Sequence, residues 1–253
     1  MRLDNKIVLI TGGAAGIGAG IAQRFSEAGA VVVIFDVNGT GALHMEQKLR
    51  QTGRALAIQG DVASEDQVKS AVERIVAEFG NLDVLVNNAG IDIEGPLVEM
   101  SSSVWDRQLG VNLKGAFLCS KYAIPQMRGR GGAIVNISSV RAFVSYEGNA
   151  AYDASKAGMI GLTRALALEH GRDGIRVNAI CPGYIDTPMM DDWLRMQADP
   201  EATLRQVLSI HPVGRMGTPR DVAEATLFLA SDAAAFISGT FLVIDGAMSA
   251  AGH

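Results

Sequence analysis

Two side chains capable of acid–base chemistry lie four residues apart in the stretch "AAYDASKAG", residues 150–158. On a helix this spacing places the phenol of Tyr152 and the ammonium of Lys156 on one face. A free tyrosine has a pKa of about 10, too high for a base at neutral pH, and a neighbouring ammonium lowers that pKa. Most pairs with this spacing are surface pairs, so the rest of the chain must decide whether this one is catalytic.

A second candidate site is the stretch "TGGAAGIG" (11–18), which follows a short apolar run near the N-terminus. Gly12 permits a tight turn, Gly16 lets the backbone approach a pyrophosphate, and Gly18 lets the next helix pack closely. The N–H groups at the start of that helix favour an anion. A glycine-rich turn between a strand and a helix predicts a dinucleotide-binding site.

Asp36 ends the next apolar run and bears on which dinucleotide is bound. A carboxylate at this point accepts hydrogen bonds from the adenosine ribose hydroxyls and repels a 2′-phosphate. Neither Ala15 nor Val37 supplies an arginine for that phosphate. We therefore expect NAD as the cofactor, with NADP less favoured.

Seven apolar runs alternate with helical patterns along the chain, and these elements must position the candidate groups. The runs are nearly continuously hydrophobic, as strands covered on both faces are. The alternation predicts an α/β fold: one doubly wound (Rossmann) domain with a parallel seven-stranded sheet and helices on both faces, spanning 1–253. The predicted strands are 6–11, 30–36, 54–61, 82–88, 132–138, 175–181 and 240–246; the predicted helices are 18–28, 40–51, 64–79, 104–127, 152–170 and 219–230.

Residues 187–217 interrupt this alternation with two short helical pieces that carry Met, Trp and Leu. Insertions at the carboxyl edge of a parallel sheet often cover a ligand. We expect a substrate lid at about 187–217, with a purely packing role as the alternative.

The composition excludes several other classes of protein. Of 253 residues, 48% are hydrophobic and 19% charged, with a net charge of −5. This acidic balance argues against nucleic acid or an anionic membrane as a partner, and no apolar stretch is long enough to predict a transmembrane helix. Two cysteines suit a reduced, cytoplasmic setting, and four scattered histidines predict no metal site.

Seven short motifs resemble those of the short-chain dehydrogenase/reductase family, in the same order and spacing, over nearly the whole chain. They are "TGGAAGIG" (11–18), "DV" (61–62), "NNAG" (87–90), "VNLKG" (111–115), "IVNISS" (134–139), "YDASK" (152–156) and "CPGYIDT" (181–187). The resemblance implies an oxidoreductase that interconverts a secondary alcohol and a ketone by hydride transfer to or from a nicotinamide cofactor.

The same resemblance implies a catalytic set of four residues. Tyr152 would act as general acid/base, and Ser139 would hold the reacting oxygen. Lys156 would lower the pKa of the phenol and bind the nicotinamide ribose, while Asn112 would hold a water that links this lysine to solvent. Any one of these residues has an ordinary structural explanation; their joint occurrence downstream of a phosphate loop favours an active site.

Further cofactor contacts are implied by the resemblance alone. Residues 61–62 would flank the adenine, 88–89 the adenosine ribose, and 182–187 the nicotinamide. The full expected set is Gly12, Ala15, Gly16, Ile17, Gly18, Asp36, Asp61, Val62, Asn88, Ala89, Tyr152, Lys156, Pro182, Gly183, Ile185 and Thr187. The chain departs from the family at Ala142 and Ala247, where glycine is usual, so the local backbone is less certain at both places.

The substrate pocket should be lined by segments that mix charged and large apolar residues: "IDIEGP" (91–96), "VRAFVSYEGNA" (140–150) and "PMMDDWLRM" (188–196). Arg141, Glu147 and Trp193 are the candidate substrate contacts. If two or three of the charged groups line the cleft, a small polyhydroxylated substrate such as a sugar or polyol is favoured. The alternative is that these charges point to water.

Two other functions stay open. One is an NADPH-dependent 3-oxoacyl thioester reductase, which Asp36 disfavours although "MRGRGG" (127–132) supplies two arginines for an acidic carrier protein. The other is a non-catalytic NAD-binding sensor, which would not need all four catalytic residues. Family resemblance also suggests a homotetramer in which the helices at 104–127 and 152–170 pack against copies of themselves.

Overall fold

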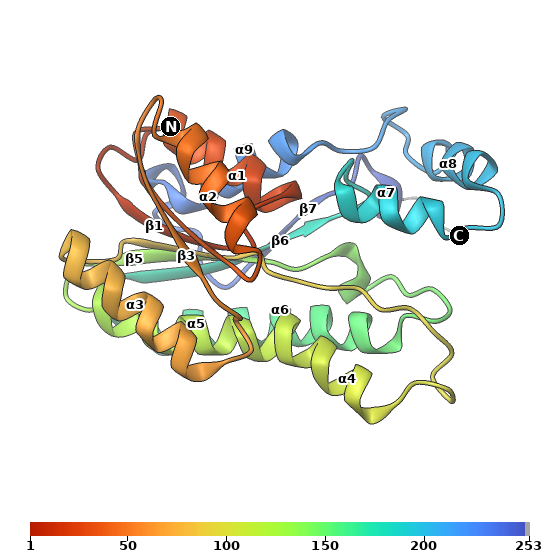
Figure 1. The fold of residues 1–253 in the computed structure, drawn as a ribbon, viewed down its shortest axis with the longest axis horizontal. Coiled ribbons are helices and arrows are strands. Elements are labelled where there is room, and N and C mark those ends of the chain that lie inside the picture. Colours follow the sequence, from red (N-terminus) through yellow and green to blue (C-terminus); the bar gives the residue numbers. More distant parts are fainter. Residues whose placement is uncertain (251–253) are drawn as a thin grey trace.

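A computed structural model describes residues 1–250 of the protein. Its centre is a parallel sheet with the strand order β3-β2-β1-β4-β5-β6-β7 (Figure 1). All seven predicted strands are confirmed, with ends that differ from expectation by two residues or fewer. They are β1 (Ile7–Thr11), β2 (Val31–Asp36), β3 (Arg54–Gln59), β4 (Val84–Asn87), β5 (Gly132–Ile137), β6 (Ile175–Pro182) and β7 (Phe241–Ile244).

Helices cover both faces of this sheet (Figure 1). One face carries α1 (Gly16–Glu27), α2 (Gly39–Leu49) and α9 (Pro219–Ala230). The opposite face carries α3 (Glu65–Phe79), α5 (Gly115–Met127) and α6 (Ala150–His170), with α4 (Ser102–Leu109) packed beside α6. The two short helices in the 187–217 segment are α7 (Pro188–Arg195) and α8 (Pro200–Ser209). None of the helices within residues 1–250 is long and apolar enough to span a membrane.

The strands are continuously hydrophobic because their side chains pack into two hydrophobic cores, one on each face of the sheet. Side chains alternate between the faces of a sheet, so neighbouring residues of a central strand are buried on opposite sides. In β1, Val8 and Ile10 belong to the core under α1, α2 and α9. Ile7 and Leu9 belong to the core under α3 and α5. The predicted doubly wound α/β fold is therefore confirmed.

The connectivity of the sheet places one crevice at its carboxyl edge. From β1 the chain proceeds outward through β2 to β3, then returns to β4 beside β1 and proceeds outward on the other side. In open parallel sheets, ligands bind outside the carboxyl ends of the strands at such a switch point. Here the glycine turn follows β1, Asn88 follows β4, and Ser139 lies just beyond β5.

The single helix predicted at 104–127 is instead three consecutive pieces. Helices α4 and α5 are joined by a π-helical turn over Gly110–Lys114, and Asn112 lies in that turn. A π-turn leaves little trace in the hydrophobic period, and such turns concentrate at functional sites. The Asn112 side chain accepts a hydrogen bond from the Ile91 N–H and donates to the Ile91 carbonyl and the Ser155 hydroxyl, 21 and 43 residues away in sequence.

The two departures from the family's glycines differ in their backbone conformation. Ala142 ends a short 3-10 turn, Val140–Ala142, and does not need glycine. Ala247 has a φ of 70°, in the left-handed region that favours glycine. The Asp245 carboxylate holds this turn by accepting hydrogen bonds from the backbone N–H groups of Ala247 (3.0 Å) and Ser249 (2.8 Å).

We expect Ala247→Gly to raise the free energy of unfolding by up to about 1 kcal/mol. Relief of about 1–2 kcal/mol of left-handed strain should exceed the roughly 0.5–1 kcal/mol that glycine adds to the entropy of the unfolded chain. The midpoint of urea unfolding measures the change. The control is Ala77→Gly on the exposed side of α3, which should lower the midpoint. Equal losses in both variants would show that Ala247 carries no strain.

Candidate active site

Ser139, Tyr152 and Lys156 converge at the carboxyl ends of β5 and β6. The Ser139 hydroxyl is buried, accepts a hydrogen bond from the Arg141 N–H at 3.1 Å, and lies near enough to the Tyr152 phenol to lower its pKa. The Lys156 ammonium lies 5.3 Å from the centre of the Tyr152 ring and donates a hydrogen bond of 3.0 Å to the Ile137 carbonyl. Helix α6 carries the tyrosine and the lysine one turn apart, as the spacing predicts.

Burial controls the acidity of this group. It raises the pKa of Tyr152 above its ordinary value, and the negative charge of Asp92 raises it further, against the opposing effects of Ser139 and Arg141. Burial also lowers the pKa of Lys156 to about 8. The expectation that Lys156 and the positive charge of an oxidised nicotinamide together lower the phenol pKa stays a prediction, and burial acts against it. The ammonium lies over the ring, where it does little to offset the desolvation of the hydroxyl oxygen.

Asn112 clamps a loop. It is fully buried, and its Oδ1 accepts a hydrogen bond from the Ile91 N–H at 2.8 Å. Its Nδ2 donates to the Ile91 carbonyl (2.9 Å) and to the Ser155 hydroxyl (3.1 Å). A Cβ on Gly90 would lie 3.5 Å from both the Asn112 Oδ1 and the Lys156 Nζ, so the amide and the ammonium face the same point. The water-holding role of Asn112 stays a prediction.

The glycine turn forms a cradle with no room for side chains. Gly12 and Gly16 have φ values of 64° and 54°, which other residues rarely adopt. A Cβ on Gly18 would lie 2.1 Å from the Gly12 carbonyl oxygen, so close packing of α1 requires glycine there. Ala15 at the N-cap of α1 offers no side-chain hydrogen bond, and the first turn has no acidic residue. Its N–H groups are therefore directed at a space suited to an anion.

The side chains of Asn88 and Thr11 hold this cradle in place. The sequence did not predict this supporting role for either residue. The Asn88 amide donates hydrogen bonds of 2.9 Å to the carbonyls of Thr11 and Gly12. The Thr11 hydroxyl accepts hydrogen bonds of 3.0 Å from the N–H groups of Asn88 and Ala89. The carboxyl ends of β1 and β4 are thus joined by side chains, and the amide of Asn88 serves the turn itself.

Asp36 lies beside the same turn. Its carboxylate accepts hydrogen bonds from the backbone N–H of Ala14 (3.0 Å) and of Asn38 (2.9 Å). Each oxygen keeps lone pairs for further donors. The adjacent Val37 side chain is 62% exposed and brings no charge. The geometry at this end suits a ribose with free hydroxyls.

The other expected cofactor residues lie around the same edge. Asp61 accepts from the Ala63 N–H (2.9 Å) and pairs with Arg107 of α4 (2.7 Å). Although burial opposes it, these two partners lower the pKa of Asp61. Thr187 caps α7, and its methyl group lies 3.5 Å from the Cβ position of Gly16. All the expected cofactor contacts stay predictions, including those of Ile17, Val62, Ala89, Pro182, Gly183 and Ile185.

The three expected substrate residues have different surroundings. Arg141 pairs with Asp153 (2.7 Å), stacks on the Tyr146 ring at 4.5 Å, and its charge acts on Tyr152. Trp193 donates its indole N–H to Glu94 (3.0 Å) and lies against Tyr184, with ring centres 6.0 Å apart. The Glu147 side chain is exposed and makes no hydrogen bond within residues 1–250. Their contact with substrate stays a prediction.

The groups that sequence reasoning missed here are Tyr184, Ser155 and Gln108. Burial raises the pKa of Tyr184 to about 12, as does the nearby Tyr146, and the Tyr184 ring lies against His211 with ring centres 5.9 Å apart. Gln108 is fully buried, and its Oε1 accepts from the Ile93 N–H. "GYIDT" places Tyr184 beside cofactor candidates and so offered a signal, whereas Ser155 and Gln108 gave none. No group of three His, Cys, Asp or Glu side chains within residues 1–250 could hold a metal ion.

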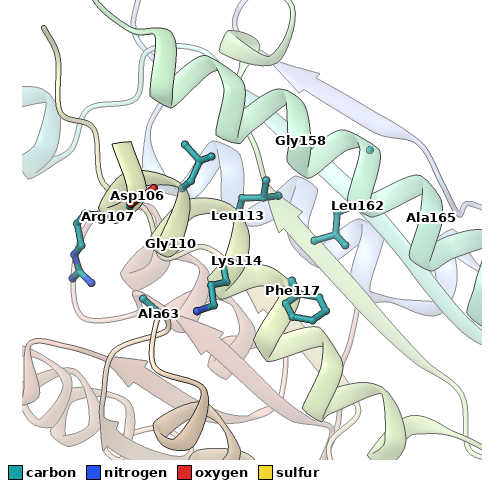
Figure 2. Close-up of a pocket in the computed structure, with 12 residues that line it drawn as sticks. Ala63, Asp106, Arg107, Gly110, Leu113, Lys114, Phe117, Gly158, Leu162 and Ala165 are labelled. Carbon is teal, nitrogen blue, oxygen red and sulfur yellow. The ribbon is translucent and has the colours of Figure 1, made fainter. Parts of the chain in front are cut away.

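A separate groove of about 890 Å³ lies away from these residues, between the α4–π–α5 segment and α6. Figure 2 shows Leu113, Phe117 and Leu162 along it, with Gly158 and Ala165 on the α6 side. The Phe117 side chain is 45% exposed. This groove is mostly apolar and carries none of the expected catalytic residues.

Comparison with known proteins adds to this geometry. Residues 12–249 match the family model described as enoyl-(acyl carrier protein) reductase. The chain is 44% identical to cis-4-hydroxycyclohexanecarboxylate dehydrogenase of Sinomonas cyclohexanicum, covering 97% of each chain. It is 40% identical to a 3-oxoacyl-(acyl-carrier-protein) reductase of Thermotoga maritima, covering 98% of this chain and 99% of that one.

Solved structures agree with the sequence comparisons. The aldohexose dehydrogenase of Thermoplasma acidophilum, in its ligand-free form, matches with a TM-score of 0.90 and 38% identity. The match covers 98% of this chain and 96% of that one. The glycine cradle, the Ser139–Tyr152–Lys156 group and these matches over the whole length give one conclusion: the chain is an oxidoreductase and belongs to the short-chain dehydrogenase/reductase family.

Proposed function

We propose that the protein is an NAD(H)-dependent dehydrogenase that interconverts a secondary alcohol and a ketone, with Tyr152 as general acid/base. The observation that carries this proposal is the convergence of the buried Ser139 hydroxyl, the Tyr152 phenol and the buried Lys156 ammonium at the carboxyl ends of β5 and β6. These groups lie at the same sheet edge as the glycine cradle. A reacting carbon placed between them could exchange a hydride with a dinucleotide held by that cradle.

The residues present fit a nicotinamide dinucleotide. Added Cβ atoms at Gly12 and Gly18 would collide with Ala89, Asn88 and the Gly12 carbonyl, so the turn can keep this shape only with glycine, and the start of α1 has no side-chain cap that would compete with a phosphate for its N–H groups. Asp36 would hold the adenosine ribose, and the segment after β6, from Pro182 to Thr187, would hold the nicotinamide end. When bound, the cofactor supplies the hydride acceptor in oxidation and the hydride donor in reduction.

The chain's own residues move the proton. The Ser139 and Tyr152 hydroxyls would both contact the substrate oxygen, which fixes the carbinol carbon. In oxidation the Tyr152 phenolate accepts the hydroxyl proton; in reduction the neutral phenol donates it to the carbonyl oxygen. Lys156 supplies a positive charge in a desolvated cleft, where such a charge has its strongest effect.

Asp36 supports NAD over NADP. Its carboxylate is anchored by two backbone N–H groups, so it cannot readily turn away from a 2′-phosphate. Neither Ala14, Ala15 nor Val37 offers a compensating cation. The Thermotoga maritima relative is a 3-oxoacyl reductase and so supports the alternative, an NADPH-dependent reductase.

The substrate we propose is small and polyhydroxylated, such as a sugar or polyol. Arg141, Asp92 and Asp153 all act electrostatically on Tyr152, so the surroundings of the reacting oxygen are polar. The solved aldohexose dehydrogenase has the same fold. We propose the 187–217 segment as the lid over this pocket, since Trp193 of α7 is tied to Glu94 of the loop after β4.

The second candidate is the 3-oxoacyl thioester reductase. Its basis in this chain, the arginine pair of 127–132, is weakened because Arg128 lies 3.3 Å from the Asp173 carboxylate. A neutralised arginine attracts an acidic carrier protein less strongly. The relative in Thermotoga maritima is the observation that favours this function.

Cofactor binding and turnover together test the proposal. We expect fluorescence titration to give tighter binding of NADH than of NADPH, and we expect NADH to form when a panel of sugars and polyols is added with NAD. Preference for NADPH with reduction of a 3-oxoacyl thioester would favour the second candidate instead. Cofactor binding without turnover of any alcohol or ketone would support the sensor.

We also propose that the groove shown in Figure 2 is an interface between copies of this chain in a homotetramer. The groove is apolar and follows the helices predicted to self-associate. Gly161 of α6 lines it, and a Cβ there would meet no atom of its own chain within 4 Å. A side chain at 161 would therefore reach outward without disturbing the fold.

We expect Gly161→Glu to dissociate the assembly, because a charge would be buried in an apolar interface. Sedimentation should show a shift from four times 26.6 kDa towards smaller species. Helical circular dichroism should stay unchanged. Ala77→Glu on the exposed side of α3 is the control and should leave the assembly intact. An unchanged assembly for Gly161→Glu would remove this groove as the interface.

A further inference from the structure

The loop after β4 is clamped on both sides of Asp92. Asn112 binds both backbone groups of Ile91. Gln108, fully buried, accepts a hydrogen bond of 2.7 Å from the Ile93 N–H. Gly95 donates its N–H to the Gly148 carbonyl, just before the catalytic helix α6, at 2.9 Å. The backbone that carries Asp92 is thus held against α4, the π-turn and the start of α6.

The Glu94 carboxylate of the same loop already has hydrogen-bond partners. Its Oε1 accepts hydrogen bonds from the Trp193 indole (3.0 Å) and the Asn149 amide (3.5 Å). The Asp92 carboxylate, by contrast, has no hydrogen-bond or ion-pair partner within residues 1–250. The Asp92 carboxylate is therefore a hydrogen-bond acceptor without a protein partner, carried on a backbone that is held in place.

The charge of Asp92 acts on the catalytic group. It raises the pKa of both Tyr152 and Lys156. Burial and the neighbouring Glu94 raise the pKa of Asp92 itself to about 6, against the charges of Arg141 and Lys156. Asp153, from α6, also faces it. The Asp92 side chain is exposed to solvent, and no residue bonds to it. Its loop begins beside the reacting groups, since the Cβ position of Gly90 lies 3.5 Å from the Lys156 Nζ and the next residue, Ile91, is bound to Asn112.

We propose that the Asp92 carboxylate is a specificity-determining group that accepts a hydrogen bond from a second hydroxyl of the substrate, close to the carbinol that reacts at Tyr152. This inference rests on the proposed alcohol dehydrogenase function and deepens it. Substrates with a neighbouring hydroxyl would be preferred over the same alcohols without it.

The surrounding charges favour a neutral hydroxyl as the occupant. A substrate carboxylate would meet the negative charges of Asp92 and Glu94, while the Arg141 cation is already paired with Asp153 at 2.7 Å. A substrate ammonium would be opposed by the Lys156 and Arg141 cations. A hydroxyl can donate to Asp92 without adding charge, and an active site built for that bond rejects an analogue that lacks it.

Matched substrate pairs test this proposal. The pairs are 2,3-butanediol with 2-butanol, and glucose with 2-deoxyglucose, each member added with NAD to wild type, Asp92→Ala and Asp92→Asn. We expect Asp92→Ala to lower kcat/KM by about 10- to 100-fold for the hydroxylated member and by less than about threefold for its partner. Glu99→Gln, an exposed carboxylate of the same loop, is the control and should change neither.

A pH profile separates recognition from a general disturbance of the loop. The Asp92 anion raises the pKa of Tyr152, so both Asp92 variants should shift the rise of kcat/KM for oxidation to lower pH. The charges of Glu94, Arg141, Asp153 and Lys156 remain in both variants. An unchanged profile would contradict the placement of Asp92 beside the phenol.

Failure of this inference can be told apart from failure of the proposed function. If wild type oxidises the panel but Asp92→Ala affects both members of a pair equally, the role of Asp92 is overturned and the function stands. If wild type oxidises no alcohol, the function is overturned. Isothermal titration of glucose into the protein with NADH then decides about Asp92: weaker binding in Asp92→Ala supports recognition, and equal binding overturns it.

Discussion

Replacing Tyr152 by phenylalanine should lower kcat by about 10²- to 10⁴-fold, the usual contribution of general acid–base catalysis. The substitution removes only the phenol hydroxyl, and the ring over which Lys156 lies is retained. The glycine cradle and Asp36 are untouched, so binding of NADH should be retained. Steady-state turnover and fluorescence titration on the same preparation measure the two effects separately.

Tyr122→Phe is the matched control for this experiment. Tyr122 lies on α5, and its hydroxyl donates a hydrogen bond to Glu65 at 2.8 Å, away from the cleft. Loss of that hydroxyl should leave kcat unchanged. If Tyr152→Phe turns over as fast as wild type, another group supplies the proton and the proposed mechanism is wrong. If neither wild type nor variant turns over any substrate while both bind NADH, the sensor becomes the better reading.

The raised pKa of Tyr152 also predicts the direction of the pH dependence. Oxidation needs the phenolate, so its kcat/KM should rise with pH into the alkaline range. Reduction needs the neutral phenol, which is the dominant form at neutral pH when the pKa is high. A bound oxidised nicotinamide brings a positive charge and should move the rise for oxidation to lower pH.

The second large effect should come from the ribose end of the cleft. We expect Asp36→Asn combined with Val37→Arg to reverse the preference for NADH over NADPH by roughly 100-fold or more. The double change removes a charge that repels the 2′-phosphate and adds a guanidinium that can bind it. Val37 is largely exposed, so arginine displaces no core residue. Asparagine keeps one oxygen, which can accept from the N–H of either Ala14 or Asn38, so one of the two anchoring hydrogen bonds is lost.

The two single variants separate the effect of removing the carboxylate from the effect of adding the guanidinium. Val37→Arg alone leaves the carboxylate in place and should improve NADPH binding only modestly. Asp36→Asn alone should weaken NADH binding without creating a phosphate site. Fluorescence titration of all four proteins with both cofactors gives the comparison. Tight NADPH binding by wild type would show that Asp36 does not select the cofactor.

Sequence patterns predicted correctly those elements that are determined by interactions between residues close together in the chain. The doubly covered strands were visible because each run is apolar at every position, and α9 was predicted with its observed bounds. At its start, Thr218, Pro219 and Asp221 form a capping box with proline in the first turn. The Tyr152–Lys156 pair follows in the same way from the helical period, and Gly12 and Gly16 from the backbone angles of the turn.

Motif order carried the prediction further than any single residue could. Ser139 and Tyr152 lie on different elements, and their contact depends on β5 ending beside the start of α6. The family resemblance supplied that contact in advance, and the structure brings the two hydroxyls together. The preference for NAD over NADP is predicted from Asp36, and fluorescence titration with both cofactors would test it.

The sequence by itself determined the strand–helix alternation, the glycine turn and the Tyr152–Lys156 pair on one helix face, because each depends on residues within about one element's length. Only the tertiary structure decided which distant groups meet. Asn112 in the π-turn bonds Ile91, 21 residues away, and Trp193 of α7 donates to Glu94 of the loop after β4, 99 residues away. The raised pKa of Tyr152 likewise depends on burial and on Asp92. Such contacts arise from chain segments that converge only when the sheet is assembled, so no local period or spacing could reveal them.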